Sequence, residues 1–294
     1  MTKIIAHRGA RSIAPENTIV AADIARLIGA ELWETDVSVT RDGHLILFHD
    51  DHLLRTTDVL KKFPHYNSFQ LDKFYLAQIQ TLDTGAAFIE NDPFGEIASG
   101  NISRDSLESF KGEKIPTLED ALNYTKKTRW SINLELKEQS GKLYGFPLPQ
   151  AVADMIYKIG VDRELIIISS FNHKWLNQIN NLLPGVTTQP LFGDTPDHKI
   201  DWREVFSKII YSQDHSKNIS SNVVYPFGYD FETYNINSTM ITIEEIARLK
   251  RMGKKVNLFT VNDKHEMIQY INANVDGIFT DYPQIMTKIV GKGC

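Results

Sequence analysis

Two acidic residues stand two positions apart in a stretch with the composition of a β-strand. Glu34 and Asp36 lie within residues 32–39, and because successive side chains of an extended strand point to opposite faces, the two carboxylates share one face. If both faces of the strand are covered, the charges lose hydration and repel each other, at a cost on the order of several kcal/mol. A bound divalent cation would offset this cost. The alternative is an exposed edge strand with a solvated acidic face.

A second candidate strand, residues 131–136, adds further polar groups. Alternation places Asn133, Glu135 and the following Lys137 on one face. Glu135 can supply a third oxygen ligand, and such ligands suit Mg²⁺ or Ca²⁺, with Mn²⁺ as a further possibility. Lys137 can meet an anionic substrate as a point charge. The alternative is a pair, Glu135 and Lys137, whose charges compensate each other on a surface strand.

Two histidines each follow a short apolar run. His7 comes after residues 4–6 and His49 after residues 45–48, which places both at the carboxyl ends of strands, where barrel enzymes hold their catalytic groups. Near neutral pH, two imidazoles can act as a general base and a general acid. A single histidine at a strand end usually has a structural role, but two beside a carboxylate cluster favour catalysis.

The residues after the first of these histidines are suited to phosphate. Arg8 offers a planar fork of donors that matches phosphate oxygens, and Gly9 allows the backbone to bend closely around a ligand. Arg8 can instead be the partner in a simple salt bridge. Downstream, Asn17 or Thr18 is a candidate cap for the first helix, and Glu16 either contributes to that cap or hydrogen-bonds into the site.

These side chains need a scaffold that brings strand ends together. Short β-type apolar runs alternate with helical stretches along the whole chain, which is typical of parallel βα units. If residues 32–39 and 45–48 form a hairpin through residues 41–43, eight parallel positions remain, and the chain is expected to be a TIM-type (β/α)8 barrel. The expected strands cover residues 3–6, 32–39, 45–48, 131–136, 165–169, 187–191, 229–236, 255–260 and 277–280.

One long segment interrupts this alternation. Residues 51–115 are rich in Asp, Asn, Gly and Ser, with weak helical periodicity near residues 71–82, so they are expected to form a small insertion after the second barrel strand. The whole chain, residues 1–294, is then one domain. Residues 193–227 look similarly irregular. Helices are expected to begin near Thr117, a candidate cap, and at Pro283. Another is expected to cover residues 243–252 and to end before Gly253.

The composition argues against several classes of protein. A net charge of −5 disfavours general binding to nucleic acid, which depends on Lys and Arg that neutralise phosphates. No apolar run approaches the roughly 20 residues of a membrane span. Residues 1–7 lack the apolar stretch of a secretory signal, so a cytoplasmic location is expected. The single cysteine, Cys294, excludes an intrachain disulfide. A small anionic molecule held in one pocket is the expected partner.

Taken together, these motifs resemble those of the glycerophosphodiester phosphodiesterase family. In order and spacing they span nearly the whole chain. The matching segments are His7–Ala10, Ala14–Thr18, Glu34–Val37, Thr40–Gly43, Phe48–Asp50, Arg55–Asp58, Ile115–Glu119, Asn133–Lys137, Ser169–Phe171, Thr260–Asn262 and Val275–Pro283.

The resemblance implies a barrel with a small inserted domain after the second strand and one bound divalent metal, Mg²⁺ or Ca²⁺. The activity that it implies is the hydrolysis of glycerophosphodiesters to an alcohol and glycerol 3-phosphate. The implied metal ligands are Glu34, Asp36 and Glu135. The implied acid and base pair is His7 and His49, and the implied phosphate contacts are Arg8 and Lys137.

Some features depart from the family pattern. Phe259 stands where the family commonly has a tryptophan before Thr-Val-Asn, which keeps an apolar wall near the substrate but removes an indole donor. Val59 replaces a usual glycine, and residues 86–112 look longer than typical. Two alternative functions follow: a lysophospholipase D-type enzyme acting on larger lipids, or a barrel that binds phosphodiesters without cleaving them. The insertion contains aromatic residues that either offer an apolar surface to a lipid or pack into its core: Phe63, Tyr66, Phe69, Phe74, Tyr75 and Phe88.

Overall fold

A closed barrel of eight parallel strands lies at the centre of the protein. The computed structural model describes residues 1–139, 141–193, 202–214 and 231–291. The sheet runs from β1 through β9 and back to β2, and the pairing of β1 with β2 closes it. The TIM-type barrel expected from the sequence is confirmed. Its strands are β1 Lys3–His7, β2 Leu32–Val39, β4 Ser131–Leu136, β5 Ile166–Ser170, β6 Thr187–Phe192, β7 Thr233–Asn237, β8 Lys255–Phe259 and β9 Gly277–Thr280.

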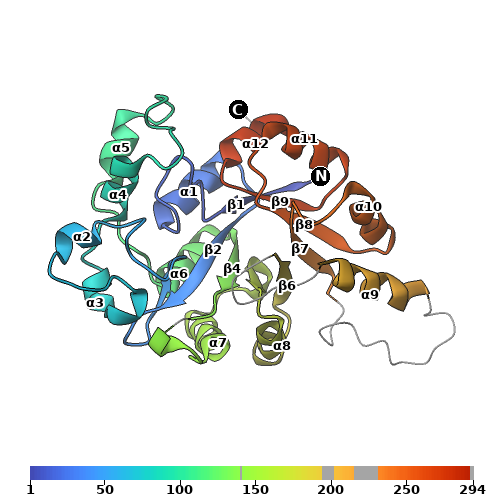
Figure 1. Ribbon diagram of the computed structural model, residues 1–294, viewed down its shortest axis with the longest axis horizontal. Coiled ribbons are helices and arrows are strands. Elements are labelled where there is room, and N and C mark those ends of the chain that lie inside the picture. The colour runs from blue at the N-terminus through green and yellow to red at the C-terminus, as the bar shows by residue number, and fades with distance from the viewer. Residues whose placement is uncertain (140, 194–201, 215–230, 292–294) are drawn as a thin grey trace.

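Helices cover the outside of the barrel (Figure 1). In the part of the chain that the structure describes, none of them is long and apolar enough to cross a membrane; the cytoplasmic location stays a prediction. The helices that follow barrel strands are α1 Ile19–Ile28, α6 Leu118–Thr128, α7 Leu148–Ile159, α8 His173–Leu182, α9 Trp202–Asp214, α10 Ile243–Arg251, α11 Lys264–Asn272 and α12 Pro283–Ile289, with short 3₁₀ turns η2 Gly141–Leu143 and η3 Arg163–Leu165.

Strand β2 is covered on both of its faces. All eight of its residues are buried. Trp33 and Val37 pack in the apolar cluster beneath the outer helices, whereas Leu32 packs against Ile5 and Phe279. Glu34 and Asp36 alternate with Trp33 and Val37 along the strand and therefore face the barrel interior. This arrangement excludes the exposed edge strand that the sequence left open.

The short strand β3, Leu45–Leu47, forms a hairpin with β2. It pairs antiparallel, with Val37 opposite Leu47 and Val39 opposite Leu45. Gly43 in the connecting turn has a φ of 82°, a left-handed conformation that glycine adopts without steric cost. The hairpin returns the chain toward the strand ends, so that residues directly after β3 lie near those of β2. It confirms the expected hairpin, one residue shorter than the range 45–48.

Residues 51–115, all of which the structure describes, contain short helices and no strand. Much of this segment packs around apolar groups of its own, including Leu53, Phe74 and Leu82. Figure 1 shows its helices together beside α1 and β2. We propose that it is an insertion within a single domain. Its elements are α2 Val59–Lys62, η1 Leu71–Lys73, α3 Leu76–Ile79, α4 Thr84–Asn91 and α5 Arg104–Phe110.

The expectation that residues 193–227 are irregular is wrong for α9. Trp202, Val205 and Ile209 repeat at helical spacing and are all buried, so the periodic signal was present but lay between polar stretches. Residues 194–201 and 215–230 lie outside the described part of the chain. They include the first two positions of the strand expected at 229–236.

Strand β7 begins at Thr233, so the described residues 231 and 232 of the strand expected at 229–236 lie outside it. The other differences from the sequence-based boundaries are small. β5 begins one residue later than expected, at Ile166, and α10 ends at Arg251 rather than at residue 252. Thr18, rather than Asn17, caps α1 with its side chain. Thr117 forms a reciprocal capping box with Asp120, which confirms the start of α6.

Packing between α4 and α5 predicts a strong effect of a small substitution. A Cβ atom placed on Gly85 would lie 1.6 Å from the carbonyl oxygen of Phe110. Because the obstacle is backbone, Gly85→Ala should destabilise the protein by at least about 2 kcal/mol in urea unfolding. Glu90→Ala, an exposed change on the same helix, should shift stability by less than about 0.5 kcal/mol. Equal stability of the two variants would contradict this packing.

Candidate active site

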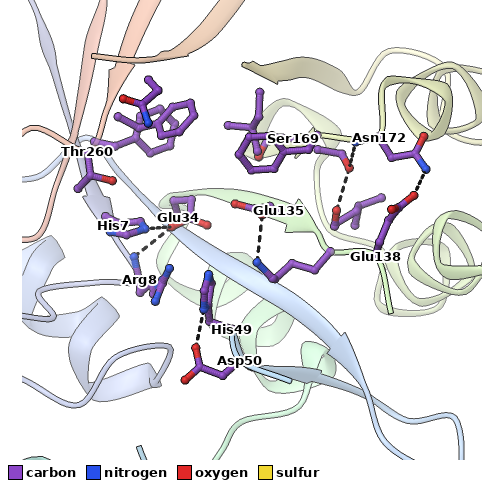
Figure 2. A pocket seen from close by; sticks show the side chains of 18 of the residues that line it. His7, Arg8, Glu34, His49, Asp50, Glu135, Glu138, Ser169, Asn172 and Thr260 are labelled. Atoms are coloured by element: carbon purple, nitrogen blue, oxygen red, sulfur yellow. Dashed lines mark hydrogen bonds and ion pairs between the residues drawn. The ribbon is translucent and has the colours of Figure 1, made fainter. Parts of the chain in front are cut away.

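A cavity of about 840 Å³ opens at the carboxyl ends of the barrel strands. The residues predicted from the sequence converge on it from different elements (Figure 2). The cavity wall includes seven of the eight predicted residues: His7, Arg8, Glu34, His49, Glu135, Lys137 and Phe259. The eighth, Asp36, is 1% exposed and lies among them, as the distances below show.

Glu34, Asp36 and Glu135 form a compact carboxylate cluster. One oxygen from each lies within 4.8 Å of the others. Strand register explains this, because Asp36 of β2 is opposite Glu135 of β4, and Glu34 is two residues before Asp36 on the same face. Glu34 and Asp36 are almost completely buried. The structure thus brings together the three residues that the sequence predicted as ligands.

The charge in this cluster is only partly compensated by protein groups. Burial and the neighbouring charges of Asp36 and Glu135 raise the pKa of Glu34 well above its ordinary value, and burial also raises the pKa of Glu135. Oε1 of Glu34 and Oδ1 of Asp36 are buried without a hydrogen-bond partner. Unsatisfied oxygen atoms on converging carboxylates are the donor set of a hard divalent cation. The residues present therefore fit a single Mg²⁺, Ca²⁺ or Mn²⁺ ion.

Asp36 differs from the other two carboxylates because basic groups surround it. Burial by itself would raise its pKa, but the charges of Arg8, His49 and Lys137 hold the pKa below its usual range. Its Oδ2 accepts a hydrogen bond of 2.9 Å from Asn17 Nδ2 and lies 3.1 Å from Arg8 Nε. Asp36 therefore remains ionised at neutral pH.

Arg8 crosses the base of the site. Its backbone has a φ of 54°, which directs its amide N–H toward Glu34 Oε2 at 3.1 Å, while its guanidinium contacts Glu16 at 3.0 Å. Burial alone would lower the pKa of Arg8, but Asp36, Glu16 and Glu34 raise it instead. The salt-bridge role that the sequence allowed is present, and contact with a phosphate stays a prediction.

Lys137 follows β4 and reaches the same cluster. Its Nζ atom lies 3.6 Å from Glu135 Oε1 and 3.8 Å from Asp36 Oδ1. Burial opposes its charge, but Glu135 and Asp36 outweigh that effect and raise the pKa of Lys137. The ammonium group therefore stays protonated beside the cavity, where an anion can approach it.

Each histidine is held by a carboxylate at its Nδ1 atom. His7 Nδ1 lies 2.6 Å from Asp281 Oδ1, and His49 Nδ1 lies 2.6 Å from Asp50 Oδ1. His7 Nε2 lies 3.9 Å from Glu34. Burial and the charge of Arg8 lower the pKa of His7, so its ring is neutral near pH 7. Both rings line the cavity, as a pair of proton-transfer groups must.

Phe259 forms part of an aromatic wall on another side of the cavity. Its ring packs edge-on against Phe171 at 6.0 Å and Phe279 at 6.3 Å between centroids. A Cβ atom on Gly193 would lie 3.3 Å from this ring. The wall is apolar, as the sequence predicted for Phe259, and its contact with a substrate stays a prediction.

Sequence reasoning assigned no role to the two carboxylates that hold the histidines. Burial opposes ionisation of Asp281, but its hydrogen bond from His7 and nearby basic charge lower its pKa to about 2. The pKa of Asp50 is likewise held below its usual range, by His49 and Arg55 against the effect of burial. Asp50 follows His49 directly, which was a usable signal. Asp281 is 274 residues from His7 and is brought to it by the pairing of β1 with β9.

The aromatic residues of segment 51–115 pack mainly with one another. Phe74 is fully buried, and its ring lies 5.4 Å from both Phe63 and Tyr66. Phe88 packs edge-on against Phe110. None of these side chains is among the residues that line the cavity in the described part of the chain. The core-packing interpretation is therefore favoured for Phe74 and Phe88, whereas Tyr66 and Tyr75 are 41% and 44% exposed.

Comparison with known proteins identifies the family. The family model described as the glycerophosphoryl diester phosphodiesterase family matches residues 7–285. The chain belongs to this family. It is accordingly a phosphoric diester hydrolase, and membership assigns it to a family of divalent-metal enzymes, in agreement with the acidic cluster.

Curated relatives align along nearly their whole length with this hydrolase. A glycerophosphodiester phosphodiesterase of Caldanaerobacter subterraneus is 30% identical over 298 residues, covering 99% of both chains. One from Bacillus altitudinis is 28% identical, covering 98% of both. The inferred family is thus supported over the barrel and segment 51–115 together.

Solved structures share the fold. A phosphodiesterase of Oleispira antarctica, in complex with the product sn-glycerol 3-phosphate, superposes with a TM-score of 0.70 at 24% identity, covering 99% of this chain and 97% of that one. A glycerophosphoryl diester phosphodiesterase structure from Silicibacter pomeroyi gives a TM-score of 0.73 at 22% identity, covering 99% and 93%. At this identity the likeness concerns the fold.

The raised pKa of Glu34 predicts that this residue stabilises the metal-free protein less as the pH rises. The folded-state pKa of Glu34 lies above its ordinary value of 4.5, so the folded state binds a proton that the unfolded state has released. The contribution of Glu34 to stability therefore falls as the pH rises above about 4.5. In chelator at pH 8, Glu34→Gln should be more stable than the wild type by on the order of 1–3 kcal/mol, and less so at pH 5. Urea unfolding at both pH values measures this.

The control for this comparison is Glu119→Gln, which removes an exposed charge that pairs with Lys158 at 2.9 Å. It should follow the wild type at both pH values. If Glu34→Gln also followed the wild type at both, the carboxylate cluster would not be strained by its own charge.

Proposed function

We propose that this protein hydrolyses glycerophosphodiesters to an alcohol and glycerol 3-phosphate in a reaction that requires one divalent cation. The observation that carries the proposal is the convergence of three carboxylates, two of them buried, with two histidines at the mouth of one barrel. Family membership supports the substrate class, as does the glycerol 3-phosphate bound by the Oleispira antarctica relative. The cavity of about 840 Å³ has room for a small diester.

Glu34, Asp36 and Glu135 are the proposed ligands of Mg²⁺ or Ca²⁺, with Mn²⁺ as a further candidate. Bound there, the cation would neutralise negative charge on the phosphoryl oxygens. Oε1 of Glu34 and Oδ1 of Asp36 support this assignment, because neither has a hydrogen-bond partner among the described residues. Arg8 and Lys137 complete the positive surroundings of the phosphate in this proposal.

His7 and His49 are the proposed acid and base pair. One ring accepts the proton of the nucleophile, and the other donates a proton to the leaving alkoxide. The low pKa of His7, which burial and Arg8 cause, suits it to be the base. Either water or the neighbouring glycerol hydroxyl is the nucleophile, and the second route gives a cyclic phosphate first. Phe259 would border the organic part of the substrate.

Removing either imidazole should abolish most of the activity. We expect His7→Ala and His49→Ala each to lower kcat on glycerophosphocholine by about 10²–10⁴-fold, with thermal stability close to that of the wild type. Phosphorus NMR of the products measures turnover and reports any cyclic phosphate. Normal turnover by His49→Ala would show that the acid and base assignment is wrong.

Chelation should stop turnover reversibly. Treatment with EDTA is expected to reduce hydrolysis of glycerophosphocholine to background, and Mg²⁺, Ca²⁺ or Mn²⁺ added singly should restore it. Glu135→Gln, which removes one proposed ligand, should weaken metal binding by at least about 10-fold in calorimetry. Glu119→Gln is the matched control and should bind as the wild type does. Full activity after exhaustive chelation would contradict the metal assignment.

A further inference from the structure

Alternating acidic and basic side chains link the two histidines by a route that avoids the carboxylate cluster. The link joins groups that are far apart in the sequence: the end of β1 and the loop after it, the residues after β3, segment 51–115 and the residue after β9. In order, its members are His7, Asp281, Arg11, Glu16, Arg55, Asp50 and His49.

Glu16 lies at the centre of this network. Its side chain is 9% exposed, and its two oxygens accept four hydrogen bonds from three guanidinium groups. Arg55 donates to Oε1 at 2.7 Å and to Oε2 at 2.8 Å; Arg11 donates to Oε2 at 2.6 Å, and Arg8 to Oε1 at 3.0 Å. Both oxygens are therefore fully engaged.

One arm of the network runs from Glu16 to His49 through Arg55. Besides its two bonds to Glu16, Arg55 donates through Nε to Asp50 Oδ2 at 2.6 Å and through Nη2 to Asp50 Oδ1 at 2.9 Å. Asp50 Oδ1 is also the oxygen that contacts His49 Nδ1. Binding two carboxylates at once requires the planar fork of an arginine, which a lysine cannot reproduce.

The other arm runs from Glu16 to His7 through Arg11. Arg11 Nη1 lies 3.4 Å from Asp281 Oδ1, the longest link in the network, and Asp281 contacts His7 Nδ1. Asn262 holds the second oxygen of Asp281 at 2.8 Å. Segment 51–115 supports this arm too, because the guanidinium of Arg11 lies 5.2 Å from the ring centroid of Phe94.

The network fixes which nitrogen of each ring carries the proton. Asp281 and Asp50 are ionised at neutral pH, as their lowered pKa values require, so each accepts a hydrogen bond and the Nδ1 atom of each ring is the donor. Nε2 of each ring is then the atom that exchanges a proton with a ligand in the cavity. Loss of the Glu16 charge would remove one partner from Arg8 and Arg11, whose side chains are only 9% and 14% exposed.

We propose that Glu16 is a positioning residue that keeps the Nδ1 atom of both histidines protonated and directed at its aspartate, through Arg11 on one side and through Arg55 of segment 51–115 on the other. This inference rests on the proposed function for its catalytic consequence, but the tautomers themselves do not depend on it. The inference also gives segment 51–115 a role. This segment supplies Arg55, and its Phe94 ring packs against Arg11, so that it maintains the geometry of the two histidine rings.

The test is nitrogen-15 NMR of the full-length protein, which reads the protonation of each histidine nitrogen through couplings to the carbon-bound ring protons. His7→Ala and His49→Ala assign the signals. At neutral pH the wild type should show a protonated Nδ1 in both rings and an unprotonated Nε2 in His7. Glu16→Gln should shift both rings toward the Nε2-protonated form, Arg55→Lys that of His49 alone, and Arg11→Lys that of His7 alone. Glu119→Gln should shift neither.

Kinetics on glycerophosphocholine complete the test. We expect Glu16→Gln to lower kcat by about 10- to 100-fold with a much smaller change in KM, as for other groups that act through a catalytic residue. Unchanged tautomers in Glu16→Gln, or the same shift in both rings from either arginine substitution, would overturn the network. A wild type that fails to hydrolyse the diester would instead overturn the proposed function, while the ring nitrogens would still decide the network.

Discussion

The whole site depends on the cost of keeping three carboxylates together away from water. Glu34, Asp36 and Glu135 are placed side by side by the register of two parallel strands, and nearby basic groups compensate only Asp36 well. An arrangement of this kind is unfavourable unless another positive charge joins it. Folding of the barrel therefore creates, as a consequence of strand geometry, an acidic cluster that could hold a metal ion.

Two histidines reach the cavity beside that cluster from different elements of the fold. His7 is the last residue of β1. His49 follows the hairpin of β2 and β3, which turns the chain back toward the strand ends. The Nδ1 atom of His7 contacts Asp281, and that of His49 contacts Asp50. These aspartates are tied to Arg11 and Arg55, and Glu16 joins both arginines to Arg8, which also contacts Asp36 of the carboxylate cluster.

Much of this site could be predicted from the sequence. Alternation along a strand was enough to place Glu34 beside Asp36, and apolar runs were enough to place the histidines at strand ends. The contact between Asp281 and His7 could not be predicted by spacing alone, because it requires the first and last strands to pair. The bonds of Arg55 to Glu16 depend on the path of segment 51–115, which has no periodic pattern strong enough to fix it. Helix α9 was missed because its apolar positions lie between polar stretches.

The most direct measurement is anomalous diffraction from crystals of the protein grown with Mn²⁺. The account predicts one strong peak between Glu34, Asp36 and Glu135, with an oxygen of each carboxylate roughly 2.0–2.6 Å away, the range of hard divalent cations. Crystals of Glu34→Gln should lose that peak while the barrel is unchanged. A wild-type crystal with no peak among these three carboxylates at saturating Mn²⁺, or with the ion bound elsewhere in the cavity, would contradict the central claim.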